Sequence, residues 1–311
     1  MEYRQLGPAG VRVSVIGLGT NRFGGPLSQE QVNNVIDYSQ DFGINLIDSS
    51  NSYQKGKSEE TLGVALKGRW DKFVLASKFY FPAGEGTNDR GTSRYHLMNA
   101  VEDSLTRLQS DHIDLYYVHR WDPAVPIEET LRGLDDLIRM GKVRYVGCSD
   151  FASWQLAHAN LLAEVKGWTP FVVIQSEYHM LNRDVEREVL PYCQAHNVGF
   201  VPYFPLAGGF LTGKYKRGEP APPGSRGEGG SHFDGYMNDA GYTIVEKLTA
   251  WAAERERGIN ELAQAWLMAQ PMVCSVITGA TKFEHVESNA KAADWQLSEQ
   301  DLAEIGEIIG E

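Results

Sequence analysis

The chain has 311 residues, with 29 Lys and Arg against 41 Asp and Glu, which gives a formal net charge of −12. This balance argues against a nucleic-acid partner, because such proteins need a cationic surface that neutralises phosphates. No apolar run approaches the roughly 18 to 20 residues that cross a membrane, and the first residues lack the basic-then-apolar order of a signal peptide. We therefore expect a cytoplasmic protein with no membrane partner and no nucleic-acid partner.

The three cysteines, Cys148, Cys193 and Cys274, are odd in number and widely spaced, and none belongs to a Cys-x-x-Cys motif. This arrangement excludes a disulfide framework and a zinc finger. We expect reduced, buried thiols and no metal site.

Eight short apolar runs that end in small or polar residues predict β-strands. They are Val15–Gly19, Ile44–Ile47, Phe73–Ser77, Ile113–Val118, Val143–Gly147, Phe171–Gln175, Gly199–Tyr203 and Ser275–Thr278. Segments with helical apolar spacing lie between them, for example at residues 29–42, 93–108, 128–140 and 184–196. Ser28, Ser93 and Asn182 are candidate N-caps for three of these helices.

Eight strands that alternate with helices predict a parallel sheet buried on both faces, and eight such units close into a (β/α)8 TIM barrel of the α/β class. A doubly wound open sheet is the alternative. One domain would span residues 1–311, with an N-terminal β-hairpin within residues 1–14 that covers the closed end of the barrel. The Gly- and Pro-rich stretch at about 214–241 predicts a long mobile loop after the seventh strand, either a lid or disordered chain.

Four polar residues follow neighbouring strands at the carboxyl end of the predicted barrel, where active sites of this fold lie: Asp48, Tyr53, Lys78 and His119. Each alone has an ordinary structural explanation, but together they form a proton-transfer set. Tyrosine titrates near pH ~10, and an adjacent ammonium such as Lys78 lowers that pKa by stabilising the phenolate. Asp48 would keep the lysine charged, and His119 would donate to a carbonyl or share the proton with Tyr53. The set suits protonation of a carbonyl oxygen.

The run DSSNSYQKGKSEETLG, from Asp48 to Gly63, is similar to the signature of the aldo-keto reductases, in which Asp and Tyr are separated by four residues and followed by a Gly-x-Ser-Glu run. The similarity continues in order along the chain, through FVLASK, DLYYVHRWDP, GCSDF, QSEY, YFPLAGGFLTGK and GATKFEHVESN. The Pro-Leu-x-x-Gly-x-Leu-x-Gly-Lys run resembles in particular the branch that includes bacterial general reductases and potassium-channel β-subunits.

The resemblance implies reduction of aldehydes and ketones with NADPH, NADH being the less favoured cofactor. Tyr53 would be the general acid, Lys78 and Asp48 would lower its pKa, and His119 would orient the carbonyl. The dinucleotide would lie extended across the barrel mouth and not in a Rossmann fold. The residues expected to contact it are Gly19, Thr20, Asn21, Ser149, Asp150, Gln175, Tyr203, Pro205, Leu206, Gly208, Leu211, Gly213, Lys214, Gly279, Thr281, Lys282, His285, Ser288 and Asn289.

Within this set the resemblance implies that Ser149, Asp150 and Gln175 hold the nicotinamide carboxamide and that Tyr203 stacks on the ring. Lys282 precedes a predicted helix, whose N-terminus favours phosphate, and its charge suits the 2′-phosphate of NADPH. A tight strand exit at Gly19 and a core amide at Gln175 are alternative, purely structural explanations for those two residues.

Five positions depart from the family pattern: Asp150 replaces Asn, Phe204 replaces Ser, Gln54 replaces Gly, His285 replaces Gln and Ser288 replaces Glu. A carboxylate at position 150 cannot donate a hydrogen bond to the carboxamide oxygen. These departures affect individual cofactor contacts more than the overall prediction.

An aromatic lining formed by Phe23, Phe79, Tyr80 and Trp121 would suit hydrophobic or ring-bearing small-molecule carbonyls. Two other functions stay open: a nucleotide-binding regulatory subunit that senses redox state, like the potassium-channel β-subunits, and an NADP-dependent alcohol or sugar dehydrogenase. The sequence leaves the physiological substrate and the oligomeric state open.

Overall fold

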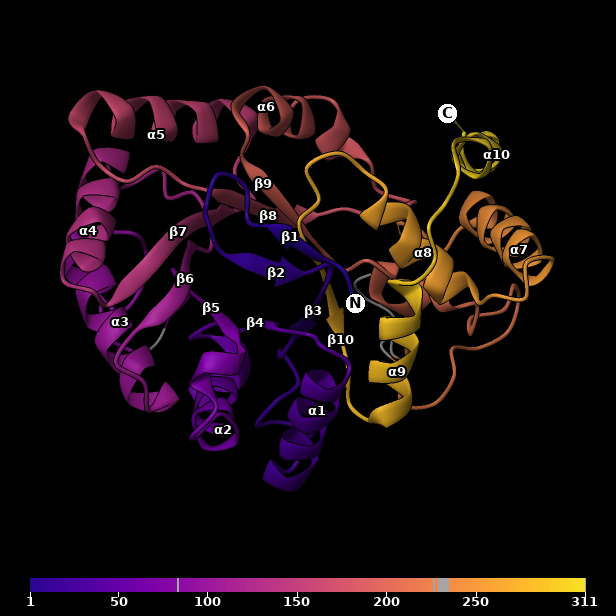
Figure 1. Cartoon of the computed structure of the whole chain (residues 1–311), viewed down its shortest axis with the longest axis horizontal. Helices are drawn as coiled ribbons and strands as arrows, with labels where there is room; N and C mark the ends of the chain where they lie inside the picture. The colour runs from indigo at the N-terminus through magenta and orange to yellow at the C-terminus, as the bar shows by residue number, and fades with distance from the viewer. Residues whose placement is uncertain (83, 226, 229–234, 311) are drawn as a thin grey trace.

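Eight parallel strands form the wall of a barrel, and helices on its outside connect successive strands (Figure 1). The computed structural model describes residues 1–311 except 83, 226, 229–234 and 311. The strands of the wall are β3 (Ile16–Gly19), β4 (Leu46–Asp48), β5 (Val74–Phe79), β6 (Ile113–Val118), β7 (Val143–Ser149), β8 (Val173–Glu177), β9 (Gly199–Tyr203) and β10 (Val276–Gly279). Each corresponds to a predicted strand, and no end is shifted by more than two residues. The predicted (β/α)8 barrel is confirmed, and the open doubly wound sheet is wrong.

The barrel closes through the residues that precede β10. Neighbouring strands pair in the order β10-β3-β4-β5-β6-β7-β8-β9. The amide of Phe200 in β9 donates to the carbonyl of Met272 at 2.8 Å, and the amide of Cys274 donates back to the carbonyl of Phe200 at 2.9 Å. These bonds use backbone groups that an open sheet would leave unpaired at its edge.

Ten α-helices are found among the described residues, most of them on the outside of the barrel. They are α1 (Gln29–Asp41), α2 (Lys57–Ala65), α3 (Arg94–Leu108), α4 (Ile127–Arg139), α5 (Ser153–Lys166), α6 (Val189–His196), α7 (Asp239–Ala253), α8 (Ile259–Met268), α9 (Phe283–Ala292) and α10 (Glu299–Ile309). Four short 3-10 helices are η1 (Tyr53–Gly56), η2 (Trp70–Lys72), η3 (Asp184–Glu186) and η4 (Ala207–Thr212). Ser28 and Ser93 cap α1 and α3 as predicted, because their hydroxyls accept from the third backbone N–H of each helix.

The helix predicted at residues 184–196 is only partly correct. The structure divides it into η3 and α6, and α6 begins at Val189. Pro191 has no N–H, so an α-helix tolerates it only in the first turn, and a later start puts it there. Asn182 therefore does not cap α6; its side-chain oxygen accepts from the amide of Asp184 at 3.4 Å.

The N-terminal hairpin covers the closed end of the barrel, as predicted. Strands β1 (Tyr3–Gln5) and β2 (Arg12–Ser14) pair antiparallel. Leu6 and Val13 are fully buried and belong to the apolar cluster inside the barrel. Gly7 has a φ of +57°, and a Cβ there would lie 2.2 Å from the carbonyl oxygen of Val172, so the hairpin tip reaches the start of β8 only because this residue is glycine.

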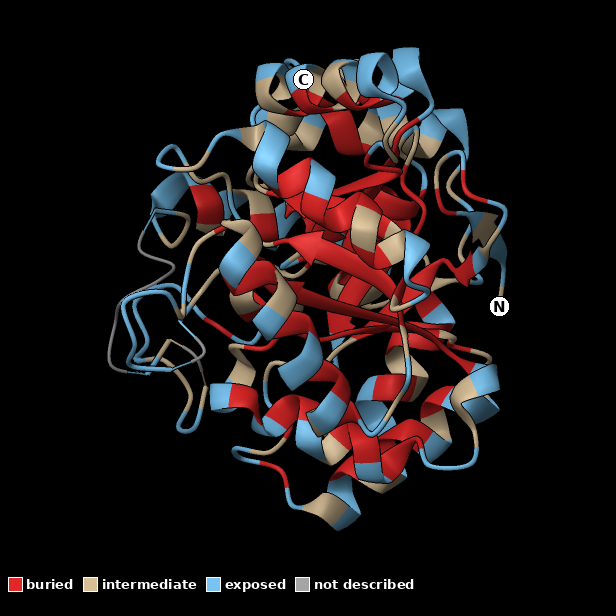
Figure 2. Ribbon diagram, turned by 90° about the vertical axis from the view of Figure 1, so that its left-hand side faces the viewer, coloured by how far each residue is buried: buried red, intermediate tan, exposed pale blue. Residues whose placement is uncertain are grey.

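Apolar side chains form two cores, one inside the barrel and one between the barrel and the helices. Figure 2 shows the strands as the buried centre, while the helices alternate buried and exposed residues. Successive residues of a strand face opposite sides of a sheet, so each strand contributes to both cores. This packing fixes the strand ends at the open mouth, where the candidate site lies.

The segment between β9 and α7 contains η4 and the long loop predicted at 214–241. Helix α7 starts at Asp239, with Asn238 as its N-cap, so the loop ends slightly earlier than predicted. The predicted loop includes residues 226 and 229–234, which lie outside the described residues. Among the residues that the structure describes, no helix is both long and apolar enough to cross a membrane.

Candidate active site

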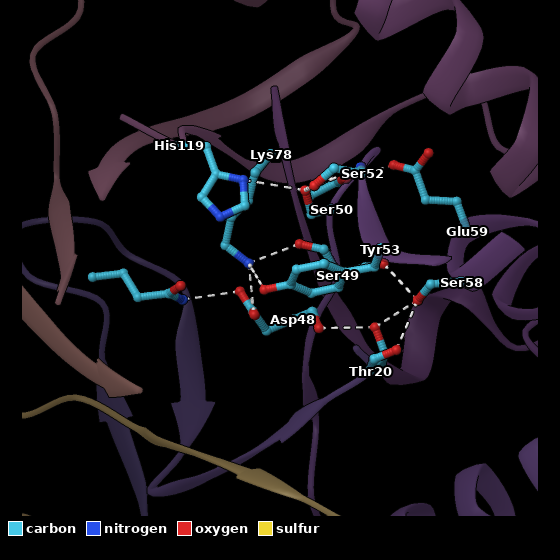
Figure 3. Close-up of polar contacts among 12 residues, drawn as sticks. Thr20, Asp48, Ser49, Ser50, Ser52, Tyr53, Ser58, Glu59, Lys78 and His119 are labelled. Atoms are coloured by element: carbon cyan, nitrogen blue, oxygen red, sulfur yellow. Dashed lines mark hydrogen bonds and ion pairs between the residues drawn. The ribbon is translucent and has the colours of Figure 1, made fainter. Parts of the chain in front are cut away.

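A buried ion pair lies at the carboxyl ends of two neighbouring strands (Figure 3). The ammonium of Lys78, from β5, lies 2.6 Å from a carboxylate oxygen of Asp48, from β4, and the two side chains are 0% and 4% exposed. Lys78 also donates to the carbonyl of Ser49 at 2.8 Å. Burial lowers the pKa of Lys78. The negative charge of Asp48 and the interactions with Asp48 and Tyr53 outweigh this effect and raise the pKa above the ordinary value. Lys78 is therefore a fixed cation at neutral pH.

Tyr53 is held over this cation by a tight turn. Its hydroxyl accepts a hydrogen bond from Lys78 Nζ at 3.2 Å. The next two residues, Gln54 and Lys55, have φ values of +50° and +57°, the left-handed region that disfavours side chains. The side chain of Gln54 donates to the carbonyl of Asn21 at 2.8 Å, which anchors this turn to the loop after β3.

The pKa of Tyr53 differs from the expectation drawn from sequence. Burial raises it, Lys78 lowers it, and Asp48 raises it again, so that the net pKa lies above 10.0. Lys78 lowers the pKa as expected, but Asp48 raises it, contrary to expectation, and burial of the phenol outweighs the effect of Lys78. Tyr53 keeps its proton at neutral pH.

His119, just after the end of β6, lies beside the ring of Tyr53. Its ring centroid lies 6.2 Å from that of Tyr53, edge to face, and 4.8 Å from that of Phe81. Nδ1 is 3.2 Å from the hydroxyl of Ser50. Burial, with the nearby charges of Lys78 and Arg120, lowers the pKa of His119 to about 2. The imidazole is therefore neutral and presents one donor and one acceptor nitrogen.

Polar side chains behind the ion pair fix Asp48. The amide of Gln175 donates to the second carboxylate oxygen of Asp48 at 2.9 Å. Thr20 donates to the backbone carbonyl of Asp48 at 3.0 Å, and its hydroxyl lies 2.9 Å from that of Ser58 in α2. Gln175 and Thr20 are both buried. Gln175 thus positions the carboxylate of Asp48 and Thr20 positions its backbone, roles not predicted for either.

A second charged group lies on the opposite side of the mouth. Tyr203 donates to both oxygens of Asp150 at 3.1 and 3.2 Å, and Arg120 lies 3.4 Å from the same carboxylate. Burial raises the pKa of Asp150, while Arg120 and Tyr203 oppose that rise. Ser149 is buried at the end of β7, beside Gln175 on β8. Three predicted carboxamide contacts are therefore adjacent, but Asp150 brings only acceptor oxygens.

Basic residues lie close together near the start of α9. No side chain caps this helix, whose N-cap residue is Lys282, and the amide of His285 in its first turn donates to the carbonyl of Lys282 at 3.2 Å. Burial lowers the pKa of His285, and the charges of Lys282 and Lys214 lower it further, so both ammonium groups lie near this imidazole. Nothing lies within 4 Å of the position of a Cβ on Gly279. Lys282 also lies 3.5 Å from the carboxylate of Glu284. The uncapped helix start, the two lysines and the open glycine fit a phosphate group that takes the place of this carboxylate.

Other predicted contacts have different surroundings. Leu211 is fully buried in the outer core, and Asn289 is buried with its amide donating to Thr278 at 3.0 Å. Ser288 accepts from Asn260 at 2.7 Å, and Thr281 lies 3.2 Å from His285 Nδ1. Gly19 is the last residue of β3, and Asn21 lies on the loop that follows it. Pro205, Leu206, Gly208 and Gly213 follow β9, with Gly208 inside η4, on the carboxyl side of the barrel.

The predicted substrate lining is only partly at the mouth. Phe23 is 1% exposed, and Phe79 is fully buried and stacks on Tyr116 with centroids 5.1 Å apart. Both belong to the core between barrel and helices, which does not support contact with a substrate. Tyr80 and Trp121 are half-buried on the loops after β5 and β6. The ring against His119 is that of Phe81, which sequence reasoning missed.

Ser50 and Phe81 contribute to the site, and sequence reasoning did not select either of them. Each contacts His119 across a large separation along the chain, and neither stands at a strand end. The only available signal was proximity to Tyr53 and Lys78 in the sequence. Within the described part of the chain, no group of three or more His, Cys, Asp or Glu side chains is arranged to hold a metal ion.

Comparison with known proteins agrees with this geometry. The profile of the aldo/keto reductase family matches residues 15–309. A probable voltage-gated potassium channel subunit beta from Arabidopsis thaliana is 35% identical, over 94% of this chain and 92% of its own length. A norsolorinic acid reductase from Aspergillus flavus is 33% identical, over 96% of this chain and 78% of its own length. An NADP(+) aryl-alcohol dehydrogenase from Phanerodontia chrysosporium is 31% identical, over 99% of this chain and 86% of its own length.

The match of the family profile to almost the whole chain agrees with the barrel and with the buried Asp48, Lys78 and Tyr53 at its mouth. The chain belongs to the aldo/keto reductase family of oxidoreductases.

Proposed function

We propose that this protein reduces an aldehyde or ketone to an alcohol with NADPH, and that Tyr53 is the general acid. The observation that carries the proposal is the hydrogen bond from Lys78 to the Tyr53 hydroxyl, with Lys78 itself paired to Asp48. A phenol that a fixed cation contacts can release its proton and leave a phenolate that the cation stabilises.

The chain's own groups account for the proton transfer. Tyr53 is protonated at neutral pH, because its pKa is raised. Its proton passes to the carbonyl oxygen as negative charge develops there; the alkoxide is the stronger base, so a raised phenol pKa does not prevent the transfer. Lys78 stabilises the resulting phenolate. Neutral His119 orients the carbonyl through its ring N–H, when Ser50 donates to the other nitrogen.

The dinucleotide would supply hydride to the carbonyl carbon. Lys214, Lys282 and the uncapped N-terminus of α9 would hold its phosphates, since two cations and the positive end of a helix dipole favour negative charge. Ser149, Asp150, Gln175 and Tyr203 lie around the other side of the mouth, where the nicotinamide end would bind. Because Asp150 only accepts hydrogen bonds, it would contact the amide N–H of the carboxamide and not its oxygen.

The relatives support two further candidates. The similarity to a channel subunit beta supports a regulatory subunit that binds the nucleotide and turns over slowly. The similarity to an aryl-alcohol dehydrogenase supports the reverse reaction, with the Tyr53 phenolate as base. A cytoplasmic location is part of the proposal and is supported by three free, buried cysteines, which are typical of reducing compartments.

The proposal is tested by titrating the purified protein with NADPH and with NADH, and then following nicotinamide absorbance after an aromatic aldehyde is added. Saturable NADPH binding followed by aldehyde-dependent loss of absorbance is the expected result. Binding without turnover on a panel of aldehydes, ketones and alcohols would favour the regulatory subunit. Absence of binding would contradict the cofactor assignments.

A further inference from the structure

Asp150 brings a carboxylate to the side of the mouth where the nicotinamide would bind. It follows Ser149, the last residue of β7, and its side chain is 18% exposed. Its amide donates to the carbonyl of Gln175 at 2.9 Å, which ties it to β8. The backbone has a φ of +52°, a left-handed conformation that Asp and Asn adopt more easily than other side-chain-bearing residues. The Asn of the family pattern could therefore take the same place, and what differs in this chain is the charge.

Two side chains contact this carboxylate. Tyr203, the last residue of β9, donates to both oxygens of Asp150 at 3.1 and 3.2 Å. The guanidinium of Arg120 lies 3.4 Å from the same carboxylate, but the Arg120 side chain is 52% exposed. Water screens an ion pair of this kind, so Arg120 offsets the charge of Asp150 only in part. The ring of Tyr203, on which the nicotinamide would stack, therefore has a negative group at its hydroxyl.

A second carboxylate lies beside the same ring. Glu177 ends β8 and is the partner of Tyr203 in the parallel register, so the two side chains lie on the same face of the sheet. Nδ1 of His179 accepts from the amide of Leu181 at 3.2 Å, so the ring proton is on Nε2, which lies 3.2 Å from Glu177. A neutral imidazole leaves the charge of Glu177 in place. After burial, this charge is a further cause that raises the pKa of Asp150.

The charge of Asp150 also reaches the place of the proposed proton transfer. Burial and then Asp48 raise the pKa of Tyr53, and the charge of Asp150 raises it further. The carbonyl oxygen would lie at the Tyr53 hydroxyl, and the carbonyl carbon must come within about 3–3.5 Å of the hydride donor. The nicotinamide ring would therefore lie between Tyr53 on one side and Tyr203 with Asp150 on the other, within reach of this carboxylate.

The two oxidation states of the cofactor differ in charge at that ring. The oxidised nicotinamide is a cation, whereas the reduced ring is neutral and carries the same carboxamide. A carboxylate within about 4–6 Å stabilises a cation and has little effect on a neutral ring. A hydrogen bond between Asp150 and the carboxamide contributes to both states and largely cancels in the ratio of their dissociation constants. This ratio therefore reports the charge at position 150.

We propose that Asp150 makes this protein bind NADP+ more tightly, relative to NADPH, than a neutral side chain at the same position would. The inference rests on the proposed function, which places the nicotinamide against Tyr203. Stabilising the oxidised ring moves the equilibrium in the site toward alcohol and NADP+, and it slows the release of NADP+. Asp150 thus favours carbonyl reduction over alcohol oxidation at the chemical step.

Isothermal titration calorimetry of the whole protein with NADP+ and with NADPH tests the proposal. The titrations are made at about pH 8, well above the ordinary pKa of a carboxyl group. Asp150→Asn should raise the dissociation constant for NADP+ by about three- to tenfold and leave that for NADPH nearly unchanged. Arg120→Gln should shift the ratio the opposite way, because the charge of Asp150 is then no longer offset. Circular dichroism checks that both variants remain folded.

Asp111→Asn is the matched control. It removes the same charge from a side chain that is 94% exposed and precedes β6, at the amino end of the barrel, so the ratio should not change. If both cofactors bind and Asp150→Asn leaves the ratio unchanged, the inference is overturned and the proposed function stands. A shift of the same sign in Arg120→Gln, or an equal shift in Asp111→Asn, would overturn it as well. If the wild type binds neither cofactor, the proposed function fails and this inference fails with it.

Discussion

Lys78 and Asp48 form an ion pair of 2.6 Å with both side chains removed from solvent. Neither charge has water to replace its partner, so each depends on the other. The pair also lies directly under the Tyr53 hydroxyl, which accepts from the same ammonium. The same ion pair therefore contributes to the stability of the barrel mouth and to the proposed acid chemistry. Variants of its two residues can separate these roles.

Replacing Lys78 with Met is expected to lower the free energy of unfolding by about 3–5 kcal/mol, because Asp48 is left buried and unpaired. The double variant Lys78→Met/Asp48→Asn should recover most of that stability, since no charge is left without a partner. Reductase activity should stay lost in both. Urea unfolding of the wild type and the two variants gives the free energies. If Lys78→Met alone were as stable as the wild type, the two charges would not depend on each other as a buried pair.

His119 is expected to make stability depend on pH. Its pKa is about 2 in the folded protein, against about 6.5 in the unfolded chain. The unfolded state therefore binds one more proton between these values, so the contribution to stability is complete above pH ~6.5 and is lost as the pH falls toward 2. The slope is at most about 1.4 kcal/mol per pH unit. Urea unfolding at pH values on either side of ~6.5 measures the unfolding free energy. Its dependence on pH below ~6.5 should be weaker in His119→Gln than in the wild type.

The turn after Tyr53 stores backbone strain at Lys55, an exposed residue with a φ of +57°. Lys55→Gly should raise the free energy of unfolding by about 0.5–1 kcal/mol, because glycine relieves the left-handed conformation and offsets its own entropy cost. Lys57→Gly, two residues later at the start of α2 with ordinary helical angles, is the control and should be destabilising. If thermal denaturation shows the same effect for both variants, the strain at Lys55 is not relieved by glycine.

Lys282 is expected to distinguish the two nicotinamide cofactors. Lys282→Ala should raise the dissociation constant for NADPH by about tenfold and leave that for NADH nearly unchanged, because only NADPH has the 2′-phosphate. Lys291→Ala, near the opposite end of α9 and about equally exposed, is the matched control. Fluorescence titration measures both constants. An equal rise in the dissociation constants of both cofactors would contradict a contact between Lys282 and the 2′-phosphate.

The fold and the association of the catalytic side chains could be predicted because both follow from strand order. Eight apolar runs defined the barrel, and the carboxyl ends of parallel strands meet at one mouth, so Asp48 and Lys78 had to be neighbours. The alternation of side chains along β5 could also have excluded Phe79 from the pocket. Side chains alternate along a strand, so the residue after the inward-facing Lys78 faces the helices.

The remaining details depend on tertiary distances that no local pattern contains. The contact of Ser50 with His119 joins residues 69 positions apart. The direction of the Tyr53 pKa shift was missed because it depends on how burial and two opposite charges balance, and the sequence shows only that the charges are present. Asn182 was misplaced as a cap because the requirement of Pro191 for a first-turn position was not weighed against the apolar spacing.

The most direct test of the proposed function compares wild type with Tyr53→Phe, which removes one hydroxyl and leaves Lys78 paired with Asp48. NADPH affinity should be unchanged by fluorescence titration, while kcat for an aromatic aldehyde should fall by roughly 10² to 10⁴, the usual contribution of a general acid. Turnover close to that of the wild type, with intact cofactor binding, would remove Tyr53 from the reaction and contradict the account.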